Sequence, residues 1–466
     1  MAYFDKYGVE FTDDKKTLVQ CPEDFEGEYI IPEGVKTIGR RAFASCVNLF
    51  SIDLGDDIEE IEDEAFKYCK NLRKIRFGIN LKKIGKECFI ECGKIHVILW
   101  DATACADFEH AWMPFAWGAN PSQGNLESWP THFIESVKYI YFGQTVKHIP
   151  SYLCARFSEL EELVIPDSVE SIGEAAFAYC NPRYIYLNKK TTLYDIKSIF
   201  GGHCMSWECR CEDVQLAENP FYYCDRIEEI EVSPQNKTLA SRNGSLYDKS
   251  FSKLYKIGRK NINYYLKQHK EGYIPSLELN VYANEIEDFA GMGLEITKLT
   301  IYGCASIGKY AFWGCENLQS ISFEKEAQGN LNFNNEAEYL NFHSCAFGNC
   351  PKLKEVYWNI TDGNFIVSES FPINGITCNE YYENGERCYN YSSQITHITL
   401  GENVLKVPDF LSLLLNVTEL KLPQRFIGKI DELPAHLLKS ISIEEQDERN
   451  KKRKSPTITD ADLSIF

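Results

Sequence analysis

One nine-residue pattern recurs in this chain at a fixed interval, and it limits the possible folds more than any other feature. Residues 38–46 are IGRRAFASC, residues 61–69 are IEDEAFKYC and residues 84–92 are IGKECFIEC, each 23 positions after the last. The same Phe-x-x-Cys spacing occurs at Phe43/Cys46, Phe66/Cys69, Phe89/Cys92, Phe177/Cys180, Phe221/Cys224, Phe312/Cys315 and Phe347/Cys350. A repeat that keeps its phase indicates one structural unit built many times.

An alternating apolar pattern, L-x-x-I-x-L, follows most of these pairs. Its last three positions alternate with period 2, which predicts a short strand with one buried face. The pattern occurs at 49–54, 72–77, 227–232, 296–301, 318–323 and 353–358, and it continues without the Phe-Cys pair at 395–400, 417–422 and 438–443. One coil of this kind cannot bury its apolar residues alone, so neighbouring coils must stack.

Segment 160–180, LEELVIPDSVESIGEAAFAYC, resembles the unit of BspA-type leucine-rich repeat proteins, L-x-x-I-x-I-P-x-x-V-x-x-I-G-x-x-A-F-x-x-C. Segment 219–249 is similar to a variant unit with a hairpin in place of the helical crossing. The resemblance implies an α/β repeat solenoid, a right-handed curved rod with a parallel β-sheet on its concave face. Short or irregular convex segments and several loop or hairpin insertions complete that fold. For exported members the resemblance also implies adhesion or host-matrix binding.

The patterns divide the chain into three parts. Residues 1–27 are expected to form an N-terminal hairpin cap, because an exposed parallel edge needs cover. Residues 28–443 are expected to form the solenoid, with insertions near 100–134, 188–218, 234–294, 324–341 and 359–394. Residues 444–466 form a charged tail that we expect to be flexible.

The charge of the chain argues against nucleic-acid binding, since 49 Lys and Arg oppose 68 Asp and Glu and give a net charge of −19. No apolar run approaches the roughly 18 residues that span a bilayer. The N-terminal sequence MAYFDKYGVEFTDDKK contains no apolar signal segment. These features predict a cytoplasmic protein without membrane insertion, and a cell-surface or secreted protein is the alternative. We expect the protein to be a monomer.

The side chains that flank the central Ile of each strand are predicted to form the solvent face of the sheet, on the concave side of the rod. At these positions three successive strands carry Tyr139, Tyr141, Glu162, Tyr184 and Tyr186. Tyrosine offers a broad contact area and a hydroxyl group at low entropic cost, which suits recognition of a protein or a glycan. Tyrosine is also simply a good strand residue, so an exposed face without a partner is the alternative.

The insertion at 99–130 contains four of the seven tryptophans, including Trp112 and Trp117. So much aromatic surface either packs on the rod or contacts a partner. Self-packing is the first expectation, and Trp112 and Trp117 are a second, weaker candidate for partner binding.

The 18 cysteines follow the repeat, so we expect mostly reduced, buried thiols. One cluster differs, because His203, Cys204, Cys209 and Cys211 lie within nine residues and are all ligand types that zinc accepts. Adjacent ligands such as His203 and Cys204 seldom converge on one ion, so an ordinary insertion is the other interpretation.

Catalytic motifs are missing from the sequence, including the phosphate-binding loop, G-x-S-x-G, H-E-x-x-H and G-x-G-x-x-G. We therefore predict a non-enzymatic scaffold without a cofactor that binds a protein partner through the solvent face of the sheet and the insertions. The alternatives are a BspA-type surface adhesin without its export signal, and a zinc-binding or enzymatic protein that uses the cluster at 203–211.

Overall fold

A computed structural model describes residues 2–109, 113–117, 132–192, 224, 226–269, 272–325, 341–342, 346–360, 366–367, 379–383, 386–390, 395–408, 411 and 414–443. The chain divides into two compact units. Unit 1 comprises Met1–Ile262 and Ile286–Leu294, and unit 2 comprises Asn263–Glu285 and Glu295–Phe466.

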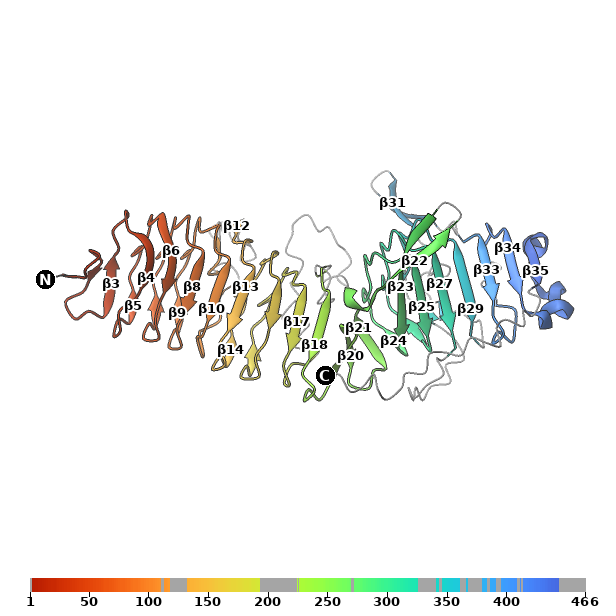
Figure 1. Cartoon of the computed structure of the whole chain (residues 1–466), viewed down its shortest axis with the longest axis horizontal. Helices are drawn as coiled ribbons and strands as arrows, with labels where there is room; N and C mark the ends of the chain where they lie inside the picture. Colours follow the sequence, from red (N-terminus) through yellow and green to blue (C-terminus); the bar gives the residue numbers. More distant parts are fainter. Residues whose placement is uncertain are drawn as a thin grey trace. The chain divides into compact units, whose positions relative to one another are not determined.

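Unit 1 contains a large sheet of eight strands, in which every neighbouring pair is parallel. In chain order the strands are β4 (Glu26–Ile30), β6 (Asn48–Asp53), β8 (Lys74–Phe77), β10 (Val97–Trp100), β13 (Tyr139–Phe142), β15 (Glu162–Val164), β17 (Tyr184–Leu187) and β18 (Glu229–Val232). Each strand lies beside the next one along the chain (Figure 1). One parallel strand per coil is the leucine-rich-repeat solenoid that the sequence predicts.

The central apolar residue of each strand points into the core, in register with its neighbours. Ile52 pairs with Ile75, and Ile98 pairs with both Ile75 and Ile140. None of these four side chains is more than 3% exposed. Because side chains alternate along a strand, the residues on either side of each Ile lie on the solvent face of the sheet.

The phenylalanines of the repeat fill the space between coils. Phe43, Phe66 and Phe89 are fully buried, and their rings stack with centroid separations of 5.0 and 5.3 Å. The thiol of Cys92 donates to the carbonyl oxygen of Phe66 at 3.1 Å. All twelve cysteines that the structure describes are buried thiols, so they contribute to packing as the sequence predicts.

The crossing segments of the regular coils at 38–46 and 61–69 each contain two residues in the left-handed backbone region. In one coil these are Arg41 and Ser45, with φ of 58° and 65°, and in the next they are Glu64 and Tyr68, again with 58° and 65°. Residues other than glycine are strained there. Hydrogen bonds to the next coil hold this geometry, as the amide of Ser45 does by donating to the carbonyl oxygen of Lys67 at 2.8 Å.

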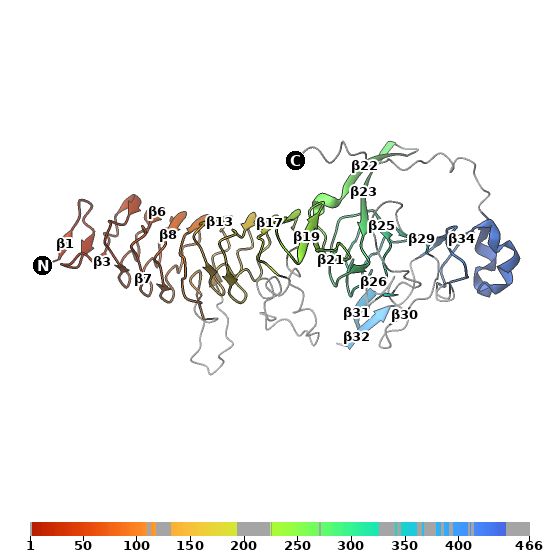
Figure 2. The ribbon, with the colours of Figure 1, turned by 90° about the horizontal axis from the view of Figure 1, so that it is seen from below.

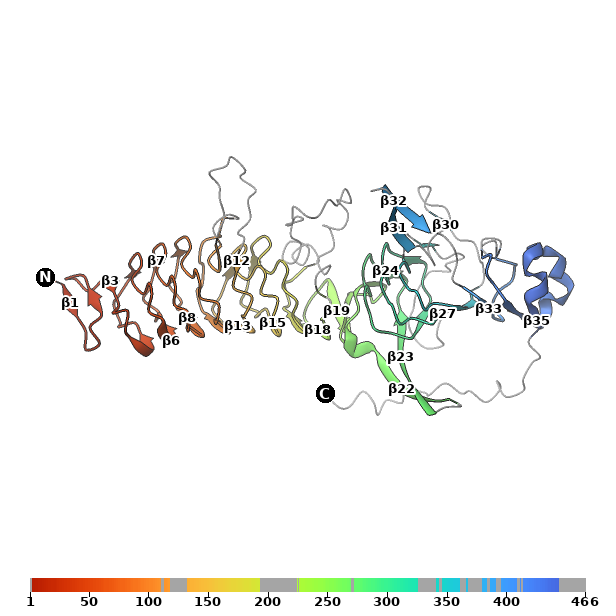
Figure 3. The same ribbon diagram turned by 90° about the horizontal axis from the view of Figure 1, so that it is seen from above.

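A second, narrower sheet lies on the opposite side of the coils of unit 1 (Figures 2 and 3). Its strands are β1 (Tyr3–Phe4), β2 (Glu10–Phe11), β3 (Thr17–Gln20), β5 (Thr37–Ile38), β7 (Glu60–Ile61) and β9 (Lys83–Ile84). The first three are antiparallel, and from β3 onward the pairs are parallel. The hairpin of β2 and β3 therefore lies against the edge of the first repeated coil.

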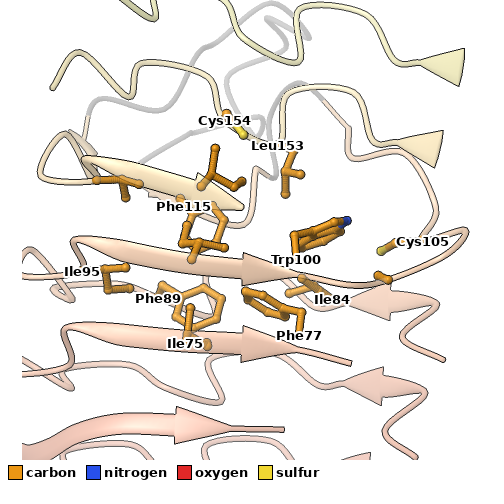
Figure 4. Close-up of a cluster of buried hydrophobic side chains, with 14 of the residues drawn as sticks. Ile75, Phe77, Ile84, Phe89, Ile95, Trp100, Cys105, Phe115, Leu153 and Cys154 are labelled. Atoms are coloured by element: carbon orange, nitrogen blue, oxygen red, sulfur yellow. The ribbon is translucent and has the colours of Figure 1, made fainter. Parts of the chain in front are cut away.

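The coil that follows β10 carries the first insertion, yet it returns a phenylalanine to the core. Phe115 is buried, and its ring stacks on Phe89 at 5.0 Å between centroids (Figure 4). Trp100 is fully buried, with its ring centroid 4.9 Å from that of Phe77. Two short strands, β11 (Ala116–Trp117) and β12 (His132–Phe133), pair beyond this point.

In the next coil the Phe and Cys positions are exchanged. The thiol of Cys180 donates to the carbonyl oxygen of Cys154 at 3.0 Å. In the regular coils the repeat Cys donates to the carbonyl oxygen of a Phe, as Cys92 does to Phe66, so Cys154 takes the place of that Phe. Phe157 stands three residues after Cys154, where the pattern has Cys, and both side chains are fully buried. Segment 149–157 thus completes a coil with the usual pair of side chains in reversed order. Strand β14 (His148–Ile149) of this coil pairs in parallel with β16 (Ser171–Ile172).

The last part of unit 1 is an antiparallel meander of β19 (Leu239–Arg242), β20 (Ser245–Asp248) and β21 (Lys253–Lys256). It ends in the 3-10 helix η3 (Arg259–Asn261). The short strand β24 (Glu285–Ile286) lies where the chain returns from unit 2.

Unit 2 has an eight-stranded sheet of its own. The strands are β22 (Asn263–His269), β23 (Gly272–Tyr282), β25 (Lys298–Tyr302), β27 (Ser320–Glu324), β29 (Glu355–Asn359), β33 (His397–Leu400), β34 (Glu419–Leu422) and β35 (Ile441–Ile443). The first pair is an antiparallel hairpin, and all later pairs are parallel. The 3-10 helices η5 (Gln424–Glu432) and η6 (Ala435–Ser440) precede β35.

The other side of unit 2 carries β26 (Ser306–Ile307), β28 (Asn341–Phe342) and β30 (Ile366–Val367), which are parallel. The antiparallel hairpin of β31 (Asn379–Glu383) and β32 (Glu386–Asn390) lies on this side too, opposite β23 (Figures 2 and 3).

Candidate functional site

The predicted binding residues lie together on the solvent face of the large sheet in unit 1. Tyr139 of β13 pairs with Glu162 of β15, and Glu162 pairs with Tyr184 of β17. Two residues further along, Val164 pairs with Tyr186. The structure therefore brings all five residues named from the sequence onto three adjacent strands.

Strand β10 adds two apolar residues to this face that the sequence analysis did not identify. Val97 pairs with Tyr139, and Leu99 pairs with Tyr141. Both are partly exposed, while Ile98 and Trp100 between and beyond them are buried. The signal was present as Ile95-x-x-Ile98-x-Trp100, the strand pattern with Trp in its last position.

These side chains form one surface, which we call the aromatic patch: Val97, Leu99, Tyr139, Tyr141, Val164, Tyr184 and Tyr186. Tyr141 is 50% exposed and Val164 is 42% exposed. The rings of Tyr139 and Tyr141 are nearly parallel, with 6.2 Å between centroids and 5° between planes. The exposed side chain of Glu162 lies between Tyr139 and Tyr184, so the surface combines apolar and aromatic groups with one carboxylate. A partly apolar surface of this kind is typical of a contact site.

Charged groups border the aromatic patch on the β8 side. The guanidinium of Arg76 contacts three carboxylates, with Nη2 2.7 Å from Asp56, Nε 3.0 Å from Asp101 and Nη1 3.1 Å from Asp53. These three hydrogen bonds fix the guanidinium and occupy three of its five N–H donors. The border of the patch is thus polar and rigid.

The border on the β18 side is formed by Glu229 and Glu231. The hydroxyl of Tyr184 donates to Oε2 of Glu231 at 2.7 Å, which orients the ring across two strands. Partial burial is the main cause that raises the pKa of Tyr184 above its usual range, and the hydrogen bond to Glu231 adds to it. The phenol therefore stays neutral at physiological pH and offers a hydroxyl group rather than a charge.

The weaker candidates from the first insertion cannot be placed in the same way. Trp112 lies outside the described residues. Trp117 lies on β11, paired with His132. The proposed zinc ligands His203, Cys204, Cys209 and Cys211 also lie outside the described residues. Within the part of the chain that the structure describes, no group of three or more His, Cys, Asp or Glu side chains could hold a metal ion.

One Ser-His-Asp arrangement occurs in unit 1. The ring of His148 lies with Nε2 2.9 Å from Oδ1 of Asp107 and Nδ1 2.8 Å from Oγ of Ser171. A serine nucleophile needs amide donors for the oxyanion. The amides of Ser171 and Gly173 already donate to the carbonyl oxygens of Lys147 and Ile149. We interpret the arrangement as a polar link between neighbouring coils.

The solvent face of the sheet in unit 2 has a different character. It forms a shallow groove of about 690 Å³ across β25 to β34. Polar and charged side chains line most of it, among them Ser320, Ser322, Glu355 and His397. The groove across β25 to β34 is therefore more polar than the aromatic patch of unit 1.

Among the residues that the structure describes, no helix is long and apolar enough to cross a bilayer.

Comparison with solved structures finds bacterial leucine-rich repeat proteins. A leucine-rich cell surface protein from Faecalibacterium prausnitzii is 17% identical, with a TM-score of 0.40, over 97% of this chain and 96% of that one. A leucine-rich repeat protein from Bacteroides ovatus is 16% identical, with a TM-score of 0.36, over 96% and 98%. The pneumococcal vaccine antigen PcpA is 13% identical, with a TM-score of 0.32, over 96% and 99%. No curated protein sequence matches the chain significantly.

A family model gives the clearest assignment. The model described as BspA type leucine rich repeat region matches residues 26–104, 132–251, 269–336 and 328–432, which together make up most of the chain. These ranges include every strand of the large sheet in unit 1 and most strands of the sheet in unit 2. The chain belongs to the BspA-type leucine-rich repeat family.

Proposed function

We propose that this protein is a non-enzymatic recognition scaffold that binds a protein partner through the aromatic patch of unit 1. The observation that supports the proposal is the register of β10, β13, β15 and β17, which gathers seven apolar or aromatic side chains around Glu162 on one solvent face. Tyrosine is among the residue types that contribute most to binding energy at protein interfaces.

The physical basis is the rigidity of the face. Strands of one sheet hold their side chains at fixed spacing, so little backbone entropy is lost when a partner docks. The buried ladder of Ile75, Ile98 and Ile140 behind the patch fixes its position. The charged border described above would favour one orientation of the partner.

The test is partner capture by the full-length chain with Tyr139→Ser, Tyr141→Ser, Tyr184→Ser and Tyr186→Ser combined. Partners bound by the wild type from an extract of the source cell are identified, and the affinity for the best of them is measured. We expect affinity to fall by more than about tenfold, because several interface tyrosines are removed.

The matched control is Tyr264→Ser with Tyr265→Ser, since these side chains are 61% and 48% exposed on β22, outside the aromatic patch. Circular dichroism and thermal unfolding verify that each variant is folded. Equal affinity of the wild type and the fourfold variant would contradict the proposal.

The adhesin hypothesis uses the same surface but places the protein outside the cell. Family membership supports it, because the resemblance implies adhesion for exported members. Labelling of intact source cells with a membrane-impermeant amine reagent distinguishes the two locations. Labelled protein favours the adhesin, and protein labelled only after lysis favours an internal scaffold.

A further inference from the structure

A hollow of about 390 Å³ lies in unit 1 beside the last strand of the large sheet. It is lined by Arg183, Tyr184, Glu228, Glu229, Arg259 and Lys260. Tyr184 also belongs to the aromatic patch, so the hollow and the patch adjoin each other. A partner seated on the patch would therefore reach the hollow.

The floor of the hollow is built by close backbone contacts. The amides of Arg259 and Lys260 donate to the carbonyl oxygens of Ile227 and Glu228, at 3.1 and 2.8 Å. Gly258 permits this approach, because a Cβ atom there would lie 2.1 Å from the carbonyl oxygen of Gly244. The two basic residues after Gly258 are thus held in a fixed place at the start of β18.

Most of the charged groups around the hollow already have partners. Nε of Arg183 donates to Oε1 of Glu228 at 2.9 Å. Lys260 pairs with Oε1 of Glu229 at 2.6 Å. The two carboxylates in the lining thus neutralise two of its three cations, Arg183 and Lys260.

Arg259 differs from these groups. Its Nε is fully buried, and it has no hydrogen-bond partner in the part of the chain that the structure describes. The guanidinium makes no ion pair with the described residues either. The side chain as a whole is partly exposed, and its other guanidinium nitrogens are the donors that a ligand in the hollow would meet. Among the described residues that line the hollow, Arg259 is therefore the cation without an ion-pair partner.

We propose that the hollow binds one carboxylate of an acidic side chain on the protein partner, with Arg259 as its main contact. This inference rests on the proposed function, because it names the chemistry of the partner that the aromatic patch recognises. A carboxylate matches the planar guanidinium of Arg259, which makes no ion pair with the described residues. The carboxylates of Glu228 and Glu229 repel a doubly charged phosphate more strongly.

The test uses a random peptide library displayed on phage and selected on the full-length protein. Peptides selected on the wild type are expected to carry Asp or Glu at a fixed distance from apolar or aromatic residues. Replacing that acidic residue by Gln in a synthetic peptide is expected to weaken binding by about tenfold or more, as expected for loss of a charge-assisted pair. Arg259→Gln in the protein should have the same effect.

The control variant is Lys237→Gln, which removes the same charge from an exposed position of unit 1 outside the hollow. It should bind the acidic peptide like the wild type. Thermal unfolding of Arg259→Gln should match the wild type, because its side chain makes no ion pair with the described residues.

Three outcomes would overturn the proposal: selected peptides without enrichment of acidic residues, equal binding by Arg259→Gln, or stabilisation by inorganic phosphate that is lost in Arg259→Gln. The last would assign the hollow to a free anion. Selected peptides that depend on Tyr139 and Tyr141 but not on Arg259 would leave the proposed function standing while this inference fails.

Discussion

The thiol of Cys69 donates a hydrogen bond to the carbonyl oxygen of Phe43, 26 residues earlier in the chain, at 3.1 Å. Unit 2 repeats the relationship, since the thiol of Cys350 lies 3.4 Å from the carbonyl oxygen of Phe312. Each cysteine therefore satisfies a buried carbonyl of the preceding coil while it fills the space beside the phenylalanine. The repeated cysteines are part of the packing between coils.

The first prediction concerns the phenylalanine stack. Phe66→Ala removes a fully buried ring that stacks on both neighbours, at 5.0 and 5.3 Å. We expect the free energy of unfolding to be about 3–5 kcal/mol lower than that of the wild type, because the substitution leaves a cavity in the core. Urea unfolding measures this difference.

Cys69→Ala is the matched comparison in the same coil. It removes a smaller side chain and one weak hydrogen bond, so we expect the free energy of unfolding to fall by only about 1 kcal/mol. A larger loss for Cys69→Ala than for Phe66→Ala would contradict the packing argument.

The second prediction concerns alkaline pH. Burial raises the pKa of the thiols of Cys88 and Cys105 from the usual 9.0 to about 12. The unfolded chain loses these protons at lower pH than the folded chain, so stability is present below pH 9 and is lost as the pH rises toward 12.

Thermal unfolding of the wild type and of Cys88→Ala/Cys105→Ala across this range checks the prediction. The variant should lose less stability than the wild type as the pH rises. If the stability of the wild type and that of the variant fell in parallel as the pH rose, the two thiols would not contribute to the pH dependence.

The third prediction concerns acid pH. Hydrogen bonds from Arg41 and then Lys67 lower the pKa of Glu64 to about 2, and the side chain is almost buried. The unfolded chain takes up this proton near the usual value of 4.5, so the contribution to stability is present above pH 4.5 and is lost as the pH falls toward 2.

Glu64→Gln should therefore be less stable than the wild type at neutral pH, by about 1–2 kcal/mol for one charged hydrogen-bonded group whose partner Arg41 is screened by solvent. The difference should shrink at low pH. Urea unfolding at neutral pH and near pH 2 measures both values, and a constant difference would refute the role of the carboxylate.

The fourth prediction concerns backbone strain. Ser45 has φ of 65°, and Gly314 occupies the same position before a repeat Cys in unit 2, with φ of 72°. Ser45→Gly should therefore stabilise the protein by up to about 1 kcal/mol, because glycine adopts this conformation without strain.

The neighbouring change Ala44→Gly is the control, because Ala44 does not have positive φ. It should destabilise the protein, because glycine raises the conformational entropy of the unfolded chain and relieves no strain in the folded one. Thermal unfolding of both variants checks the contrast, and a destabilised Ser45→Gly would show that the strain argument is wrong.

Much of the fold can be predicted from the sequence, because both halves of the repeat have a direct physical meaning. The alternation around Ile52 and Ile75 specifies a strand with one buried face, and the recurring Phe specifies stacked coils. The tyrosines of the aromatic patch follow from the same register. The predicted patch lacks Val97 and Leu99, because their strand ends in Trp100 and the sequence pattern places Trp100 in the insertion.

Other features depend on contacts between segments that no local pattern reveals. The sequence shows that Phe and Cys are displaced in 149–157, and the hydrogen bond from Cys180 to Cys154 shows that Cys154 takes the place of a repeat Phe. The hollow combines Arg183 with Arg259 across two strands and a meander. The hollow forms only because segment 239–261 folds back and brings Arg259 beside Arg183.

Phe115 has a consequence for how such a chain can change. Its coil returns to the sheet 42 residues after Val97, whereas the coil before it takes 23 residues from Lys74 to Val97. The core requires one aromatic ring in this coil, and the number of residues in the coil does not affect whether that ring can be supplied. New loops can therefore be grafted into a coil, by evolution or by an engineer, wherever the added segment supplies a ring to the vacant place in the stack.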